Sequence, residues 1–186
     1  MPTITTRESA TVTALALLTS APAILVTSIT AASVPKLVVL DIQLTGDQGG
    51  PQLTAEHAVR LKKESEILRR QLASTGLYEL LDTTPAQELI NRLTSQQAYW
   101  HDCNGCDLQV GQQLGADQVL VTWVDRVSGL ILSLTYELHD VAGGQILGRK
   151  SYDFRGDNDN AWTHAIVYMA RDLKGAQGST ANPNRP

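Results

Sequence analysis

The chain has 186 residues, 18% of them charged, and a formal net charge of -4 at pH 7. This length suits one domain with a sizeable core. The negative charge argues against a nucleic-acid binder, which needs a basic face to neutralise phosphates. The hydrophobic share of 42% is ordinary for a soluble domain, and nothing in the sequence calls for a cofactor.

Residues 1–33 have the layout of a secretory signal peptide. Residues 10–32 carry no charge, Arg7 precedes them, and small residues close the run. This layout predicts cleavage after Ala32 or Ser33 and a periplasmic location. A retained membrane anchor is the alternative, which the proline and threonines inside the run disfavour. No later stretch is apolar enough to span a bilayer, so we expect no membrane span in the mature chain.

Residues 34–174 are predicted to form a single α/β domain. The apolar run 37–40 predicts a buried strand within residues 36–43, and residues 44–53 are predicted to be a loop. A helix capped by Thr54 is expected next, because leucines recur there at three- and four-residue spacing. Gly76 is expected to end it.

A short strand at residues 77–81 and a second helix follow in the prediction. Thr84 is the expected cap of that helix, with Pro85 at its first position and Gln87 completing a capping box. A short third helix is expected to end at Gly115, and Gly111 within it would allow close approach to a neighbouring element.

The second half predicts three strands in succession, at residues 118–124, 130–138 and 146–154. The last two alternate apolar and polar residues, which is typical of half-buried strands. Matching their apolar faces requires an odd number of loop residues around Gly143 and Gly144. A three-residue loop would place Glu137 opposite Arg149 and Ser133 opposite Asp153.

A last helix is expected to begin at Asp159 or Asn160, to bury Trp162, and to end at Gly175. Residues 175–186 are rich in Gly, Pro and Asn and are predicted to be a disordered tail. The predicted order is β-α-β-α-α-β-β-β-α. It indicates an α/β (α+β) fold with a mixed β-sheet of about five strands and helices packed on the sheet.

Cys103 and Cys106 are the only cysteines in the chain. In an oxidising compartment they would most simply form a short-loop disulfide. A redox pair at a helix start is one alternative. Metal binding together with His101 and Asp102 is another, although one Cys-x-x-Cys is only half of a zinc site.

Three closely spaced carboxylates, Asp153, Asp157 and Asp159, are candidates for a hard cation such as calcium. The glycine and closing glutamate of an EF-hand loop are absent. We therefore favour a turn followed by a helix cap, and predict no metal.

The polar side of the predicted hairpin carries Glu137, His139, Asp153 and Arg155. With Trp162 at the adjoining corner, these residues are the candidate binding surface. A solvated sheet face and acid/base machinery are the alternatives. No pairing of a nucleophile with a base can be identified from the sequence, so no catalytic residue is predicted.

Several of these segments resemble known envelope proteins. An opening strand at 37–41, the segment 114–120 (Leu-Gly-Ala-Asp-Gln-Val-Leu) and the turn 140–144 resemble the group of the TolB amino-terminal domain, the curli secretion protein CsgG and the lipoprotein activators of penicillin-binding proteins. The paired cysteines and the segments 123–132 and 155–162 resemble, more specifically, an uncharacterised family of small exported bacterial proteins.

The resemblance implies a non-catalytic accessory or binding protein of the bacterial cell envelope, with an envelope or periplasmic protein as its partner. The alternative is a periplasmic thiol-redox or metal-handling accessory protein that uses Cys103 and Cys106. The family resemblance associates that alternative with quinoprotein dehydrogenases.

Overall fold

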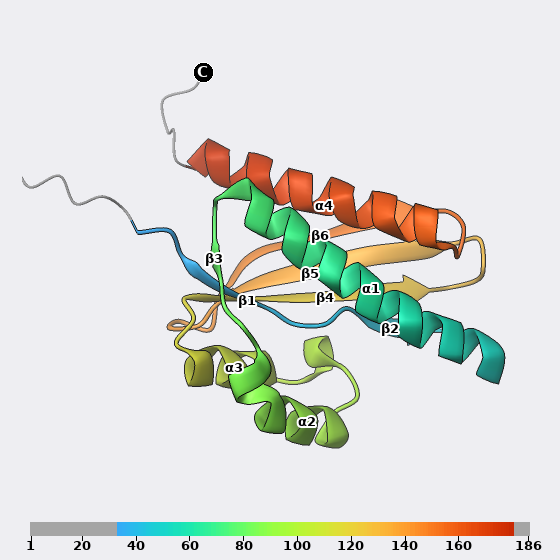
Figure 1. Cartoon of the computed structure of the whole chain (residues 1–186), viewed down its shortest axis with the longest axis horizontal. Coiled ribbons are helices and arrows are strands. Elements are labelled where there is room, and N and C mark those ends of the chain that lie inside the picture. Colours follow the sequence, from blue (N-terminus) through green and yellow to red (C-terminus); the bar gives the residue numbers. More distant parts are fainter. Residues whose placement is uncertain (1–32, 181–186) are drawn as a thin grey trace, which may run out of the picture. The chain divides into compact units, whose positions relative to one another are not determined.

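The computed structural model describes residues 33–180, and side chains up to residue 174. Residues 1–32 of the predicted signal peptide and the last six residues of the chain lie outside the described residues. The described part has the predicted α/β architecture, in which a mixed sheet lies between two pairs of helices (Figure 1).

The sheet has six strands in the described part: β1 (Lys36–Val39), β2 (Gln43–Gly46), β3 (Glu79–Leu80), β4 (Gln118–Arg126), β5 (Leu132–Asp140) and β6 (Ile146–Phe154). Their order is β3-β1-β4-β5-β6, and β2 also pairs with β4. The neighbours β3, β1 and β4 are parallel, whereas β4, β5 and β6 form an antiparallel meander.

Within residues 33–180, four α-helices cover the sheet: α1 (Pro51–Thr75), α2 (Gln87–Gln96), α3 (Cys106–Leu114) and α4 (Asp159–Thr180). Helices α1 and α4 lie on one face, and α2 and α3 lie on the other (Figure 1). Each face has its own apolar core. Leu68 of α1 and Met169 of α4 belong to the first, and Leu89 of α2 and Val110 of α3 belong to the second.

The predicted strand at residues 36–43 is correct only in its first half. Residues 40–42 interrupt it, and β2 then continues through Gly46, where the sequence predicted a loop. Val39 pairs with Leu120 but Gln43 pairs with Trp123, so the first strand holds one extra residue at the break. The backbone N–H of Ile42 donates to the Ser65 hydroxyl of α1 over 2.9 Å, which satisfies a group that the sheet no longer pairs.

Two predicted helix caps are wrong. Helix α1 begins at Pro51 after Gly50, so Thr54 lies inside its first turn. Thr84 begins a 3-10 turn ahead of α2, and its backbone N–H donates to Asp82 over 3.0 Å. The residue at the cap position of that turn is Thr83, and neither the turn nor α2 has a side-chain hydrogen bond at its cap, so the predicted capping box does not form.

Two of the three glycines predicted to end helices do so. Gly76 and Gly115 end α1 and α3 with φ angles of 68° and 66°, the left-handed conformation that glycine adopts freely. Gly175 does not end α4, which continues to Thr180.

The predicted hairpin register is confirmed. Glu137 pairs with Arg149 and Ser133 with Asp153, and an irregularity lies at Leu138/His139, next to the turn. The prediction for Gly111 is also confirmed. A Cβ atom there would lie 2.6 Å from Val119 Cγ2 and 2.7 Å from Val141 Cγ2, so any other residue would force these neighbours to shift.

Candidate functional site

A buried carboxylate, Asp157, connects the elements β4, α1 and α4. Its Oδ2 accepts a hydrogen bond from Arg126 Nε over 2.7 Å and lies 2.8 Å from His57 Nε2. Its Oδ1 accepts from Arg60 Nη1 over 3.0 Å and from the Trp162 indole N–H over 3.1 Å. The side chain of Asp157 is only 7% exposed. A carboxylate this buried requires such partners, because an unpaired charge would be very costly.

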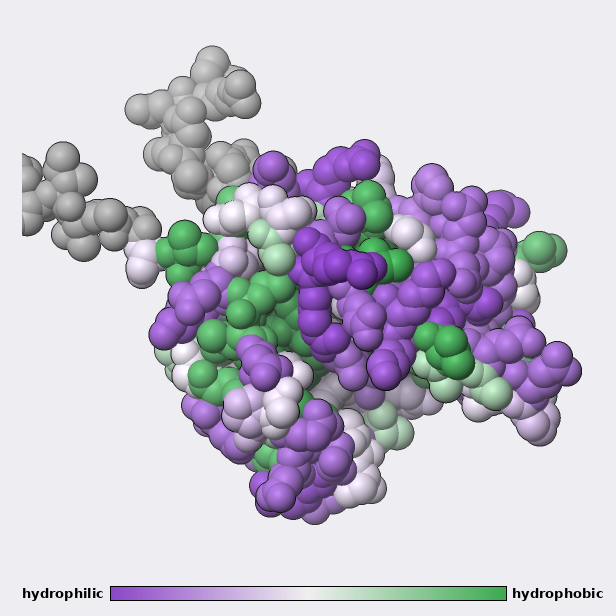
Figure 2. Space-filling view, viewed as in Figure 1, coloured by the Kyte–Doolittle hydropathy of each residue, from purple (hydrophilic) through white to green (hydrophobic). Residues whose placement is uncertain are grey.

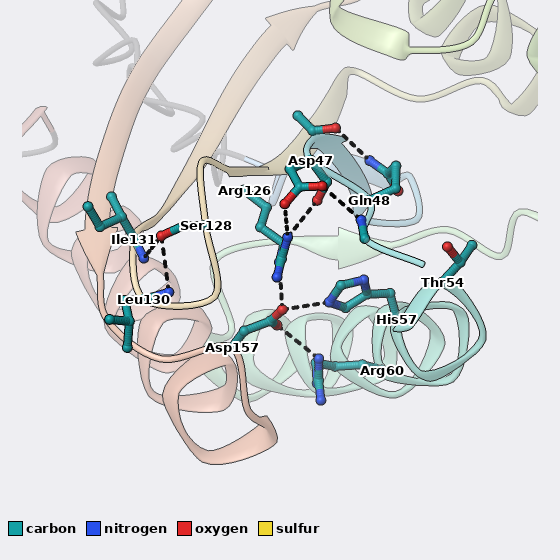
Figure 3. A network of polar contacts seen from close by, with 12 residues as sticks. Asp47, Gln48, Thr54, His57, Arg60, Arg126, Ser128, Leu130, Ile131 and Asp157 are labelled. Atoms are coloured by element: carbon teal, nitrogen blue, oxygen red, sulfur yellow. Dashed lines mark hydrogen bonds and ion pairs between the residues drawn. The ribbon is translucent and has the colours of Figure 1, made fainter. Parts of the chain in front are cut away.

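The partners of Asp157 come from distant parts of the chain. Arg126 is the last residue of β4, and His57 and Arg60 lie near the start of α1. Figure 3 shows these three side chains converging on Asp157, which lies in the turn between β6 and α4. Arg126 Nη1 also donates to Asp47 Oδ2, over 2.7 Å. The turn before α1 is thus joined to the same network.

The network keeps both charges ionised. Burial raises the pKa of Asp157, but hydrogen bonds from Arg126 and His57 outweigh it and hold that pKa below the usual aspartate value. The hydrogen bond to Asp157 raises the pKa of Arg126, against the opposing effect of burial. Both side chains are therefore charged at neutral pH.

The network supports the β4–β5 loop, residues 127–131. The backbone N–H of Asp157 donates to the Gly129 carbonyl over 3.0 Å, and that of Val127 donates to the Ile131 carbonyl over 3.1 Å. The Ser128 hydroxyl accepts from the backbone N–H groups of Leu130 and Ile131, each over 3.2 Å (Figure 3). These hydrogen bonds restrain the backbone of the loop.

This hydrogen-bonded loop presents apolar side chains to solvent. Val127 is 63% exposed, Leu130 is 70% exposed and Ile131 is 51% exposed. Figure 2 shows that the surface over α1 is mostly hydrophilic. Apolar groups that gather on an ordered loop typically mark an interaction site. We call residues 127–131 the apolar loop.

Arg155, one of the predicted surface residues, lies beside the apolar loop. It follows β6 directly, and the backbone N–H of the next residue, Gly156, donates to the Leu130 carbonyl over 3.3 Å. Arg155 is exposed. The loop therefore has a cation at its border.

Glu137 and His139 come together as predicted, but they are largely buried. His139 Nδ1 bonds the Asp107 carboxylate of α3, and its Nε2 lies 3.2 Å from Glu137 Oε2. The hydrogen bond to Asp107 raises the pKa of His139, although burial opposes it. Arg149 Nη1 lies 3.0 Å from Glu137 Oε1 and completes the cluster.

A hollow of about 340 Å³ lies above this cluster and is bordered by residues 100–105. His101 at its rim stacks on Trp123 with the ring centres 4.4 Å apart, and the Arg149 guanidinium lies 5.8 Å from the Trp123 ring. Helix α3 and the segment before it thus cover this end of the polar sheet face, while Ser151 and Asp153 further along β6 are exposed.

Cys103 lies at the border of that hollow, and its Cα atom is 5.6 Å from that of Cys106. This separation suits a disulfide. The close pair supports the disulfide reading of the sequence. Cys106 begins α3 and is 7% exposed.

The remaining predicted residues lie apart. Trp162 is 1% exposed and packs in the core, so its assignment to a binding surface is wrong. Asp159 accepts hydrogen bonds from Arg60 and Lys63 of α1, and Arg60 also donates to Asp157, so cationic side chains occupy these two carboxylates. Within residues 33–174, no three His, Cys, Asp or Glu side chains are grouped closely enough to hold a metal ion.

Sequence reasoning missed the Asp157 network and the apolar loop. Residues such as His57 and Asp157 are a hundred positions apart, and no local pattern relates them. A signal for the loop was present: Leu130 and Ile131 break the strict alternation at the start of the predicted strand.

Residues 35–173 match the model of the family DUF3280, described as "Protein of unknown function (DUF2380)". No curated protein sequence matches the chain. Among the described residues, none of the helices combines the length and apolar character that a bilayer crossing requires.

Three similar solved structures come from bacteria. The LpoB C-terminal domain from Escherichia coli is 16% identical, with a TM-score of 0.49 over 67% of this chain and 84% of that one. The PelC dodecamer from Paraburkholderia phytofirmans is 14% identical, with a TM-score of 0.47 over 77% of this chain and 87% of that one. TolB from Acinetobacter baumannii is 14% identical, with a TM-score of 0.45 over 79% and 28%. At these scores the similarities carry no argument about function.

Proposed function

Because the chain belongs to the DUF3280 family of proteins of unknown function, we propose a role from its own residues. The protein acts as an exported, non-catalytic accessory protein of the bacterial cell envelope, and it works through protein–protein contacts. The single observation that carries this proposal is the apolar loop. Three exposed apolar side chains on one short, hydrogen-bonded loop favour binding, because little conformational freedom is lost on contact.

The chemistry of the loop defines the partner it fits. Leu130 and Ile131 suit an apolar recess, and Arg155 at the border suits an acidic rim around that recess. The partner is therefore a protein with an apolar pocket edged by carboxylates. Glu137 and His139 take no part in this contact, because both are held within their own buried cluster.

A photo-crosslinking amino acid at Leu130 tests the proposal. The control carries the same amino acid at Val59, which is 72% exposed on α1. In envelope extract, we expect one distinct crosslinked species for position 130 and none for position 59. In the chain that carries the crosslinker at position 130, the double variant Val127→Asp and Ile131→Asp should abolish that species and leave the urea midpoint unchanged, because both side chains are already exposed. Equal crosslinking at both positions would contradict the proposal.

Export is proposed from residues 1–33. Mass spectrometry of the protein recovered from the periplasm should give a mature chain that begins at Ser33 or Val34. Recovery of the uncleaved chain in the membrane fraction would instead support the alternative, in which residues 1–33 remain as a membrane anchor.

The alternative redox role has a separate test. We propose that Cys103 and Cys106 form a structural disulfide, because Cys106 is nearly buried at the start of α3. We expect a reduction potential below about -300 mV, typical of structural disulfides. A potential near that of glutaredoxins would favour the redox role.

A further inference from the structure

Strand β6 is an open edge of the sheet. Within the described residues it pairs with β5 alone, and it is nine residues long. Its residues Arg149, Lys150, Ser151 and Asp153 are all exposed. A long edge strand presents backbone donors and acceptors that can pair with another strand.

The register shows which backbone groups face outwards. Gly156 donates to the Leu130 carbonyl, and the antiparallel pairing continues with Leu132 opposite Phe154. Hydrogen-bonded pairs alternate along such a ladder. The even-numbered residues of β6 therefore bond β5, and the N–H and C=O groups of Arg149, Ser151 and Asp153 point away from the sheet.

We propose that two copies of this chain pair antiparallel through β6, about a two-fold axis at Ser151. This pairing places each Ser151 opposite its own copy and each Arg149 opposite Asp153 of the second copy. Two opposite-charge pairs then form across the new ladder, and such pairs stabilise it. The two sheets become one continuous sheet, an interface of the self-complementary kind that a two-fold axis produces.

Charge selects this register from its neighbours. An axis at Lys150, at Arg149 or at Asp153 would place each of these residues opposite its own copy, with like charges in contact. An axis at Tyr152 would place Arg149 opposite Arg155 of the second copy. Like charges directly opposite destabilise a ladder. Only the axis at Ser151 avoids every such clash among these five positions.

The helix-facing side of β6 fits the same register. It places Gly148 opposite Phe154 of the second copy, where a large ring can lie over a residue without a side chain. It also places Lys150 opposite Tyr152 of the second copy. A partly apolar hollow of about 560 Å³ borders this edge, lined by Tyr152, Phe154 and Tyr168 among others, and the second strand would cover it.

The variant Ser151→Cys tests the position of the axis. Paired Cα atoms would lie about 5.5 Å apart, within the range of a disulfide. Mild oxidation of the full chain should give a covalent dimer on a non-reducing gel. Ser95→Cys is the control, because Ser95 is exposed on α2, far from β6 in the sequence. Dimer formation that is no faster for Ser151→Cys than for Ser95→Cys would overturn the proposal.

The variant Asp153→Arg tests the charge pairing by sedimentation over a concentration series. It places Arg149 opposite an arginine, so the dimer dissociation constant should rise at least about tenfold. Asp153→Glu keeps the charge and should remain dimeric. Asp153 is exposed, so neither change should prevent folding. A wild-type chain that stays monomeric throughout, or an Asp153→Arg variant as dimeric as wild type, would contradict the proposal. Neither outcome would bear on the apolar loop.

Discussion

Arg126 Nε donates to Asp157 Oδ2 over 2.7 Å, and this bond joins the end of β4 to the turn before α4. Both side chains are less than a tenth exposed. The apolar loop connects β4 to β5 and begins at the residue after Arg126. It receives one of its hydrogen bonds from the backbone of Asp157. The pair therefore supports the surface on which the proposed function depends.

Asp157→Asn should destabilise the protein by about 3 kcal/mol, because it leaves buried cationic partners without their counter-charge. Urea unfolding measures the change in the free energy of unfolding. Asp159→Asn is the matched control. Its side chain is 54% exposed, so the loss should stay below about 1 kcal/mol. Equal losses in the two variants would show that the burial of Asp157 does not determine its contribution to the free energy of unfolding.

His139 should make stability depend on pH near neutrality. Its pKa is raised in the folded protein, first by the hydrogen bond to Asp107 and against the effect of burial. The stabilisation is therefore complete below the unfolded pKa of about 6.5 and is lost as pH rises through the folded pKa. Wild type should lose stability relative to His139→Gln as the pH is raised from about 6.

Urea midpoints over a pH series measure this effect, and the imidazole signals in an NMR titration give the pKa directly. Parallel pH profiles for wild type and His139→Gln, or an imidazole pKa below that of a free histidine, would refute the prediction.

Glu64→Gln should stabilise the protein. Glu64 of α1 is fully buried, and burial raises its pKa despite the hydrogen bond that Thr163 donates to Oε1 over 2.7 Å. Its Oε2 has no hydrogen-bond partner among the described residues. An amide keeps the bond to Thr163 and removes the charge, which we expect to gain about 1 kcal/mol at pH 8.

The gain from Glu64→Gln should shrink as the pH falls, because the wild-type carboxyl then becomes neutral in the folded protein. Thermal unfolding at pH 8 and at pH 5 compares the two conditions. A variant that is less stable than wild type at pH 8 would mean that ionised Glu64 has a partner that stabilises it.

Gly111→Ala should cost about 1–3 kcal/mol, because the added methyl group would overlap Val119 and Val141 where α3 crosses the sheet. Gln112→Ala on the exposed side of the same helix should change stability by less than about 0.5 kcal/mol. Chemical denaturation of both variants gives the comparison. A neutral Gly111→Ala would show that α3 can move away from the sheet at little cost.

Local patterns in the sequence predicted those features that local physics determines. The alternation in β5 and β6 set the register of Glu137 opposite Arg149, since the side-chain period of a strand allows only one matching of apolar faces. Gly76 was predictable as a helix stop because the left-handed conformation favours glycine.

Features that depend on distant segments could not be predicted. His139 looked like a solvated residue of a polar face, but Asp107 on α3 covers it. Trp162 was correctly placed on the inner stripe of its helix but was also counted as part of the binding surface. Its hydrogen bond to Asp157 holds it inside the turn between β6 and α4, and no local pattern predicts that contact. The break between β1 and β2 depends on the Ser65 hydroxyl, which comes from the middle of α1.

The pairing of β1 with β4 also has a consequence for how the chain folds. Leu37 must find Gln118 across most of the domain, whereas β4, β5 and β6 are joined by short loops. Local contacts close with a smaller loss of chain entropy and so tend to form first. We expect the meander to be structured in the folding transition state and β1 to dock late. Substitutions in β5 should then slow refolding, while a truncation of Val38 in β1 should mainly accelerate unfolding.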